Sequence, residues 1–322
     1  MSNDNDNKIH ANSADGIDRR GFLKCMAWAG TGVLWSMHGG IVSSRAFGAP
    51  VPTSQSAVAD FTFAQLSDSH IGFAKEPNKD VIGTMRLAID RMNASNGAPP
   101  EFVLHTGDLT HLSKPAEFDA VAQLLRGAKA QRTFYVPGEH DVFTDDGREY
   151  LNRFGAGTNG RGWHSFDYRG VHFMGLVNVM NLKAGGMGVL GQEQIDWIKK
   201  DVERLTSSTP IVIFAHVPLW SVYPQWGWGT EDSAQALSVL KRFAAVTVLN
   251  GHIHQAMQKV EGNVTFHTAC STAFPQPAPG KAESPGPIKN VPAEKLRSLL
   301  GLARVTYVES RSELAIVDQA LE

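Results

Sequence analysis

Short apolar runs alternate with longer amphipathic stretches along most of the chain. The runs are rich in β-branched and aromatic residues, which predicts strands at residues 62–66, 102–105, 133–136, 163–168, 171–177, 211–215, 246–249, 256–260 and 264–268. Between several of these runs apolar residues recur at helical spacing, which predicts helices at residues 80–93, 116–130, 192–205 and 232–243. A short helix at 293–299 and strands at 304–308 and 314–318 are expected to close the chain.

The order of these elements predicts the fold class. Strands that alternate with helices indicate α/β layering. The strands of the hairpin at residues 163–177 and the last strands have no helices between them, which indicates more than a single parallel sheet. We therefore predict an α/β fold of two mixed β-sheets packed as a sandwich and flanked by helices. Residues 275–292 are Pro-rich and are expected to cross the surface without regular structure, before a closing segment at 293–322.

The first 49 residues differ in character from the rest. A polar, Asn/Asp-rich start leads to Arg19 and Arg20, a modestly apolar run follows at 25–42, and small residues surround Ala46 and Ala49. This pattern resembles a twin-arginine export signal, so residues 1–49 are expected to engage the bacterial twin-arginine machinery, with a periplasmic or secreted destination. The alternative is a membrane anchor, for which the run is barely long enough. We expect a linker at 50–60 and no membrane contact in the mature protein unless the signal stays uncleaved.

Composition narrows the classes of function. The 322 residues carry a formal net charge of −2, so no global basic field is available to hold nucleic acid by its phosphates, and stable nucleic-acid binding is not expected. The two cysteines are Cys25 and Cys270, and removal of the first 49 residues would leave only Cys270. An internal disulfide is then impossible, so the fold has to be held by its core.

Five short polar segments each come just after a predicted strand, at the edge where ligands gather in α/β sheets. They are Asp68-Ser69-His70, Gly107-Asp108, Gly138-Glu139-His140-Asp141, His216 and Gly251-His252-Ile253-His254. Asp68 and His70 are two residues apart, as are His252 and His254, so on an extended strand end each pair would point the same way. Carboxylate with imidazole suits Zn, Fe or Mn, and so many ligands predict two ions, about 3.5–4 Å apart.

The order D-x-H, G-D, G-N-H-(D/E), H, G-H-x-H resembles that of the calcineurin-like metallophosphoesterase superfamily, over residues 61 to about 272. The resemblance implies two divalent or mixed-valence metal ions and hydrolysis of a phosphoester substrate. It implies Asp68, His70 and His254 on one ion, His216 and His252 on the other, and Asp108 between them with a shared hydroxide. It also implies that His140 gives a proton to the leaving oxygen, and we expect Asp141 to orient the His140 imidazole.

One position departs from the family pattern. Glu139 stands where the family has asparagine, and an ionised glutamate can ligate a metal but cannot donate a hydrogen bond to substrate. We expect Glu139 to bind the second ion, the alternative being that it turns away. Three carboxylates then face the two ions, which leaves the site one charge less positive and favours either a more highly charged metal pair or a less charged substrate. A phosphodiester, with a single charge, would be repelled less than a dianionic monoester, so diester hydrolysis is slightly favoured over monoester hydrolysis.

Other residues near these segments are weaker candidates. His111 follows Asp108 closely enough to reach the surroundings of the site or the substrate, although a loop histidine without a role is equally common. The loop after His216 carries Trp220, Tyr223 and Trp226, which could stack on a flat leaving group. The alternative for these aromatics is hydrophobic packing of a long loop.

Three rival functions stay open on the sequence. The first is a metal-binding or receptor protein of the same fold that has lost catalysis, with Glu139 as the trace of that loss. The second is an extracellular nuclease, against which the acidic balance counts. The third is a membrane-tethered hydrolase of lipid pyrophosphates, which would require residues 1–49 to be retained.

Overall fold

The computed structural model describes residues 32–38, 41–47, 60–94, 99–180, 182, 186–309 and 313–322. The chain divides into two units, Met1–Ser56 and Ala57–Glu322. In the first unit, β1 (Gly32–His38) pairs antiparallel with β2 (Ile41–Phe47). The paired arginines at positions 19 and 20, and residues 50–59 of the expected linker, lie outside the described residues.

Five strands form one sheet of the second unit, in the order β13-β12-β3-β4-β5. In that order they cover Glu313–Ala320, Gly301–Val308, Phe61–Leu66, Phe102–His105 and Arg132–Tyr135. β3, β4 and β5 run parallel, whereas β12 is antiparallel to both of its neighbours. The carboxyl ends of β3, β4 and β5 therefore lie at one edge of the sheet.

Six strands form the other sheet, in the order β10-β11-β9-β8-β7-β6. In that order they cover Met257–Glu261, Val264–Thr268, Val246–Asn250, Ile211–Ala215, Val171–Gly175 and His164–Tyr168. The four inner strands are parallel, and the edge strands β10 and β6 are antiparallel to their neighbours. Both sheets are mixed, as predicted.

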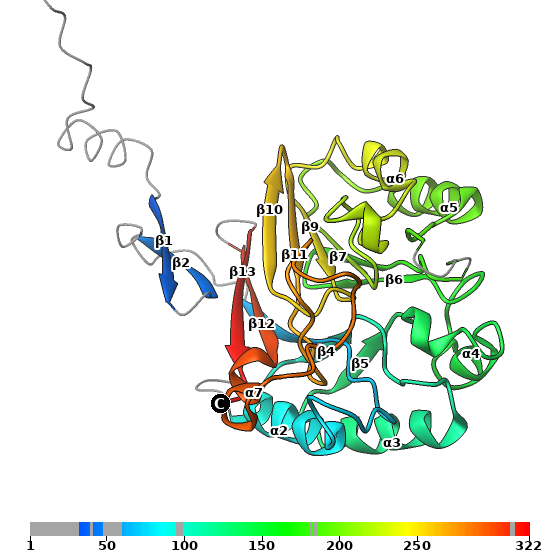
Figure 1. The fold of residues 1–322 in the computed structure, drawn as a ribbon. Helices are drawn as coiled ribbons and strands as arrows, with labels where there is room; N and C mark the ends of the chain where they lie inside the picture. Colours follow the sequence, from blue (N-terminus) through cyan, green and yellow to red (C-terminus); the bar gives the residue numbers. More distant parts are fainter. Residues whose placement is uncertain are drawn as a thin grey trace, which may run out of the picture. The chain divides into compact units, whose positions relative to one another are not determined.

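Helices cover the outer faces of the two sheets (Figure 1). On the five-stranded sheet, α2 (Val81–Ala94), α3 (Pro115–Leu125) and α7 (Ala293–Leu299) pack against side chains of β3 and β4. On the six-stranded sheet, α5 (Gln192–Val202) and α6 (Ser233–Val239) pack against β7, β8 and β9. The predicted sandwich flanked by helices is confirmed.

Side-chain alternation along the central strands explains the layers. On β3, Phe61 and Phe63 point between the sheets, whereas Ala64 and Leu66 pack under the helices. A strand buried on both faces reads as a near-continuous apolar run, and β3 departs from this pattern only at Thr62 and Gln65. The space between the sheets is filled largely by aromatic rings, and Phe63 stacks on Phe102 with ring centroids 5.0 Å apart.

The predicted elements are all present, but three helices are shorter than expected. The helix predicted at 192–205 ends at Val202. The helix predicted at 116–130 ends at Leu125, and the amide of Gly127 then bonds to the carbonyl of Leu124 at 2.9 Å. The helix predicted at 232–243 ends at Val239, and the Asn263 side chain donates to the Phe243 carbonyl at 2.6 Å in the turns that follow. One further helix, α4 (Arg148–Phe154), was not predicted.

None of the helices in the described part of the chain has the length and apolar character that crossing a membrane requires.

A buried histidine connects β7 to α5. The His172 side chain is 6% exposed, and its two ring nitrogens lie 2.8 Å from Asp167 Oδ1 and 2.9 Å from Asp201 Oδ2. Burial alone would lower the pKa of His172, but the two carboxylates outweigh it and raise the pKa above its ordinary value of 6.5.

This raised pKa predicts a pH-dependent contribution to stability. Because the pKa is higher in the folded state than in the unfolded chain, the contribution is fully present below about pH 6.5 and is lost as the pH rises through the folded-state value. We expect His172→Gln to lower the free energy of unfolding in urea by about 1–2 kcal/mol near pH 5.5 and by clearly less near pH 9. His164→Gln is the control, because burial lowers the pKa of His164. Equal losses at both pH values for His172→Gln would contradict the prediction.

Candidate metal centre

The five polar segments come together at the carboxyl ends of strands from both sheets. Asp68 and His70 follow β3, Asp108 follows β4, and Glu139, His140 and Asp141 form the single-turn helix η1 (Glu139–Asp141) after β5. His216 follows β8, while His252 and His254 follow β9. All seven residues predicted to bind metal fall into overlapping groups of three whose ligand atoms lie within 4.8 Å of one another. The predicted convergence on one site is therefore seen in the structure.

The first group consists of Asp68, His70 and His254, all buried. The Nε2 atoms of His70 and His254 lie 3.2 Å apart, and Asp68 Oδ1 lies 3.3 Å from His254 Nε2. Two imidazole nitrogens and one carboxylate oxygen thus face a common point, which is a donor set that suits Zn, Fe or Mn.

The second group consists of Glu139, His216 and His252. Glu139 Oε2 lies 2.9 Å from His216 Nε2, and Glu139 Oε1 lies 2.9 Å from His252 Nδ1. Glu139 Oε2, His216 Nε2 and His252 Nδ1 are all buried, and despite these short contacts none of them makes a hydrogen bond of ordinary geometry within the described residues. Buried polar atoms are normally satisfied, so three unsatisfied donor atoms converging on one point fit a bound cation. Glu139 has not turned away from the site.

Asp108 lies between the two groups. Its Oδ2 is 3.4 Å from His70 Nε2 of the first group and 3.4 Å from His216 Nε2 of the second. Its other oxygen, Oδ1, accepts a hydrogen bond from the backbone amide of His140 at 2.9 Å. One carboxylate therefore faces both candidate ion positions, and its orientation is held by the backbone of η1.

Backbone carbonyls hold two of the imidazoles. His216 Nδ1 donates to the Thr106 carbonyl at 2.7 Å, and His254 Nδ1 donates to the Phe274 carbonyl at 2.5 Å. Each hydrogen bond places the ring proton on Nδ1 and leaves Nε2 free to ligate, as is usual for histidines that bind metal.

Burial favours the uncharged form of each side chain at this site, but neighbouring groups of opposite charge outweigh this effect at Glu139 and His216. Burial would raise the pKa of Glu139, but His252 and His216 hold it well below its ordinary range. Burial would lower the pKa of His216, but Asp108 and Glu139 raise it well above 6.5. His70 is different, because burial and neighbouring histidines lower its pKa well below 6.5 and keep the imidazole neutral. Ionised carboxylate and neutral imidazole are the forms that bind metal, so Glu139 and His70 are already in the binding form, whereas His216 would release a proton when an ion binds.

Left-handed backbone is concentrated at the predicted ligands. Positive φ angles occur at Asp68 (53°), His70 (39°), Asp108 (50°), His252 (71°) and His254 (54°). This conformation is uncommon outside glycine and clusters at functional sites. Asp68 and His70 face the same group, as expected, but their backbone is left-handed and not extended. The expectation that His252 and His254 point the same way was wrong. Tight left-handed turns aim the side chains instead, and they send His252 and His254 to different groups.

Close approach of these turns requires glycine at one position in particular. A Cβ atom at Gly138 would overlap the Asp108 carboxylate and the Asp108 backbone amide. Glycine there lets the loop before η1 pack directly on the residue that lies between the two groups.

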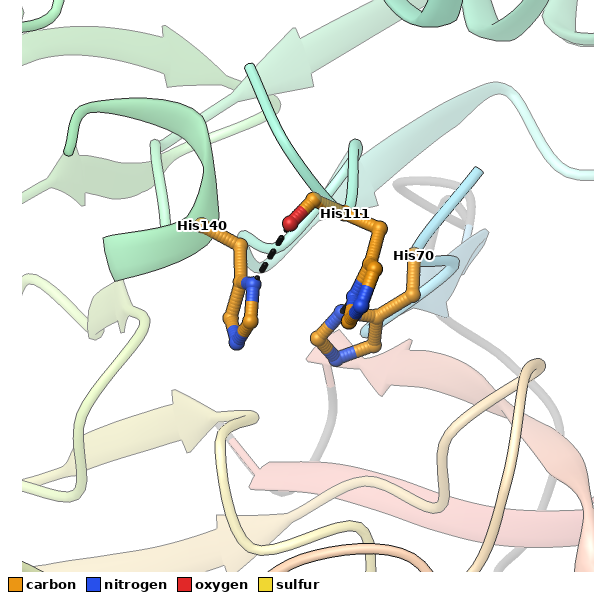
Figure 2. A group of neighbouring side chains, drawn as sticks. All are labelled: His70, His111 and His140. Atoms are coloured by element: carbon orange, nitrogen blue, oxygen red, sulfur yellow. Dashed lines mark hydrogen bonds between the residues drawn. The ribbon is translucent and has the colours of Figure 1, made fainter. Parts of the chain in front are cut away.

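His140 is positioned by a different partner from the one expected. Figure 2 shows His140 Nδ1 facing the carbonyl of His111, a contact of 2.8 Å. The His111 ring stacks on the His140 ring, with centroids 4.9 Å apart and planes 15° apart, and its Nδ1 lies 3.4 Å from His70 Nδ1. His111 therefore lies beside the site, where it was expected.

The expected contact between Asp141 and the His140 imidazole was wrong. Asp141 is fully buried, and its carboxylate accepts hydrogen bonds from the amides of Leu109 (3.0 Å), Thr110 (2.8 Å) and Gly138 (2.9 Å). Asp141 thus ties the turn after β4 to the turn before η1. It makes no hydrogen bond to the His140 ring within the described residues, although its charge contributes to raising the pKa of His140.

A cavity of about 470 Å³ opens beside the two groups. His70, Asp108, Glu139 and His140 line its inner part. The three aromatics expected near the substrate do not line the cavity. Trp226 is 8% exposed and packs with Trp228 and Ile253. The ring centroids of Trp220 and Phe266 lie 5.2 Å apart. The Tyr223 and Trp226 rings pack edge to face, with centroids 5.1 Å apart. A role for these aromatics in binding substrate stays a prediction.

A model of the calcineurin-like phosphoesterase family matches residues 61–256, which is more than half of the chain. The chain belongs to this family. No curated protein matches the sequence.

Solved structures share the calcineurin-like phosphoesterase fold at low sequence identity. A dimetal phosphatase from Danio rerio superposes with a TM-score of 0.63 at 12% identity, over 81% of this chain and 96% of that chain. The purple acid phosphatase PPD1 from yellow lupin (Lupinus luteus) seeds gives 0.59 at 14% identity, over 87% of this chain and 54% of that chain. GAP50, the anchor in the inner membrane complex of Plasmodium, gives 0.50 at 12% identity, over 82% and 85%. At these identities the likeness concerns the fold alone.

Several residues of this calcineurin-like site were missed on the sequence. The Phe274 carbonyl that holds His254, and the Thr106 carbonyl that holds His216, are backbone groups without a sequence signal. The Pro-rich segment at 275–292 was expected to be a plain surface crossing, but Gln276, Gly286, Pro287 and Lys289 line the cavity. The only signal there was that this long segment follows closely on the last predicted metal ligands.

Proposed function

We propose that this calcineurin-like protein is a metal-dependent phosphoester hydrolase with a dinuclear centre. The observation that carries the proposal is the position of Asp108, whose Oδ2 lies 3.4 Å from a histidine nitrogen of each group. A carboxylate between two separate His/carboxylate sets fits a pair of ions that share one ligand.

The donor atoms divide into two sets. Asp68, His70 and His254 would hold one ion, Glu139, His216 and His252 the other, and Asp108 would bind both. Iron, manganese and zinc all suit this mixture of imidazole and carboxylate. When bound, the two ions would supply a nucleophile by lowering the pKa of water and would offset negative charge on the phosphoryl group.

His140 is proposed as the proton donor to the leaving oxygen. Its Nδ1 is engaged by the His111 carbonyl at 2.8 Å, and its side chain lines the cavity, so Nε2 is the atom available to a leaving group. Asp108 and Glu139 raise the pKa of His140 above 6.5 against the effect of burial, which favours the protonated ring that a general acid needs.

The test combines metal analysis with turnover. Elemental analysis of the purified full-length protein is expected to give two ions of Fe, Mn or Zn per chain. Aryl phosphate monoesters and diesters are expected to be hydrolysed and to lose turnover when a chelator removes the metal. A protein that holds metal but hydrolyses no phosphoester would instead be the non-catalytic alternative, and GAP50 shows that an anchor protein can have this fold. Cleavage of DNA or RNA that weakens steeply with salt would indicate the nuclease.

Glu139 is proposed to favour diesters over monoesters. With Asp68, Asp108 and Glu139 ionised, two divalent ions leave a net charge of one, where asparagine in place of Glu139 would leave two. A dianionic monoester gains more from the extra positive charge than a monoanionic diester does. We expect Glu139→Asn to lower the ratio of diester to monoester kcat/KM by roughly threefold or more. Glu193→Asn, an exposed change on α5, is the control. An unchanged ratio in Glu139→Asn would remove the charge argument.

Export is proposed to depend on the paired arginines. Replacing Arg19 and Arg20 by lysine is expected to retain the protein in the cytoplasm, and the mass of exported protein should show removal of about 49 residues. Retention of residues 1–49 in the exported protein would favour the membrane-tethered alternative.

A further inference from the structure

Two segments far apart in the sequence form the mouth of the cavity. One is residues 73–76, which follow the Asp68–His70 turn, and the other is the Pro-rich crossing near residues 276–289. The crossing is fastened to the site, because the Gln276 side chain donates to the His252 carbonyl at 3.1 Å and accepts from the Gly286 amide at 3.2 Å. The mouth is therefore held in a defined position relative to the candidate ligands.

An aromatic wall leads from the ligands to the mouth. The Phe274 ring stacks on the His70 ring, with centroids 4.7 Å apart and planes 29° apart. The ring centroids of Phe73 and Phe274 lie 4.5 Å apart. The Phe73 and His111 rings also pack edge to face, with centroids 5.2 Å apart. Both phenylalanines line the cavity and are otherwise buried, at 5% and 4% exposure. This wall suits a flat or apolar part of a small molecule.

Two lysines line the same cavity as this wall. Lys75 and Lys289 line the cavity and are exposed to solvent, and no ion pair is seen for either of them within the described residues. The one acid beside them, Glu76, is paired with Lys79 at 2.6 Å, so its charge is already offset. Two unpaired ammonium groups at the mouth of a small cavity attract an anion.

The anion attracted by the lysines is distinct from the phosphoryl group that reacts. The phosphoryl group undergoing reaction belongs with the buried donor atoms of Asp108, His70 and Glu139, whereas the lysines are on solvent-exposed segments. Building on the proposed hydrolase function, we propose that Lys75 and Lys289 bind a second anionic group on the leaving group of the substrate. The substrate class is then a small phosphoester with a flat or apolar middle and a carboxylate or phosphate at its far end.

The test uses substrates that differ only in that distant charge. Aryl phosphates with a 4-acetate, 4-propanoate or 4-butanoate chain are compared with their methyl esters, as monoesters and as methyl phosphodiesters, and a terminal phosphonate replaces the carboxylate in a further arm. Wild type is expected to prefer the anionic form. Lys75→Gln/Lys289→Gln should lower kcat/KM for the anionic form by about three- to tenfold, mainly through KM, and leave the methyl ester within about twofold. The preference should shrink as ionic strength rises.

Lys281→Gln is the matched control, because it removes an exposed lysine from the Pro-rich crossing without touching the cavity lining. An equal loss for anionic and methyl-ester substrates would mean that the lysines attract the reacting phosphoryl group, and no loss would mean that they bind nothing. Either result overturns the inference while leaving the hydrolase function intact. If wild type hydrolyses none of these esters, titration of their phosphonate analogues into both proteins decides instead, with weaker binding of only the anionic analogue expected in the double variant.

Discussion

Replacing Asp108 by asparagine is expected to leave a folded protein that holds about one metal ion in place of two and turns over aryl phosphates about a thousandfold more slowly, equivalent to about 4 kcal/mol in the activation free energy. The Asp108 carboxylate faces a nitrogen of both groups at 3.4 Å, and a neutral amide with a single oxygen cannot supply charge to two cations. The fold should survive, because the Asn oxygen can still accept the His140 amide that Oδ1 accepts now.

Asp146→Asn is the matched control for this change. Asp146 also has left-handed backbone, with φ of 58° against 50° at Asp108, but its side chain is 71% exposed and pairs with Arg161. The two substitutions therefore have the same local backbone demands and differ in whether a buried ligand is lost. Metal content by elemental analysis and kcat/KM on aryl monoesters and diesters are measured for both. Two ions per chain and wild-type turnover in Asp108→Asn would show that Asp108 is not the shared ligand.

The site was predictable from the sequence to the extent that it depends on strand ends. The run Ile211–Ala215 is apolar on both faces and Phe61–Leu66 is so except at Thr62 and Gln65, so both runs indicate central strands. The polar residues directly after such strands must then lie at one edge of their sheet. Asp68 and Asp108 follow strands of one sheet and could for this reason be placed together from the sequence, whereas His216 follows a strand of the other sheet and was grouped with them through the family resemblance.

The direction of each side chain was not predictable in the same way. Left-handed turns at His252 and His254 aim the two imidazoles at different groups, and strand alternation gives no hint of such turns. Asp141 shows the same difficulty. Its place next to His140 suggested contact between their side chains, but the turns at Gly138 and Leu109 bring unsatisfied amides to its carboxylate instead.

Contacts made by loops were the least accessible. Phe274 reaches His254 across 20 residues of chain, and Lys289 reaches the same cavity as Lys75 although more than two hundred residues separate them. Neither segment has the periodicity that marks a helix or strand, because its conformation is set by partners elsewhere in the fold. The extent of the cavity mouth therefore emerged only with the structure.

Replacing His140 by glutamine is expected to slow hydrolysis by about a hundredfold to ten-thousandfold when the leaving group is an alkoxide, and much less when it is 4-nitrophenolate. A proton donor matters most for a leaving oxygen that is strongly basic, and a nitrophenolate departs without one. Metal content should stay at the wild-type value, because His140 Nδ1 is bonded to the His111 carbonyl and the two ligand groups are complete without this residue.

The dependence on the leaving group separates proton donation from a merely structural role for His140. His111→Gln serves for comparison, because the His111 ring stacks on His140 at 4.9 Å while its backbone carbonyl, which the substitution keeps, makes the hydrogen bond. We expect His111→Gln to lose less than about tenfold, and by the same factor for alkyl and nitrophenyl esters. If His140→Gln instead slows both classes of ester equally, or loses metal, then His140 supports the centre rather than protonating the leaving group. The leaving-group contrast thus tests the role of His140 independently of the metal assignment, because the same loaded enzyme is compared with two esters.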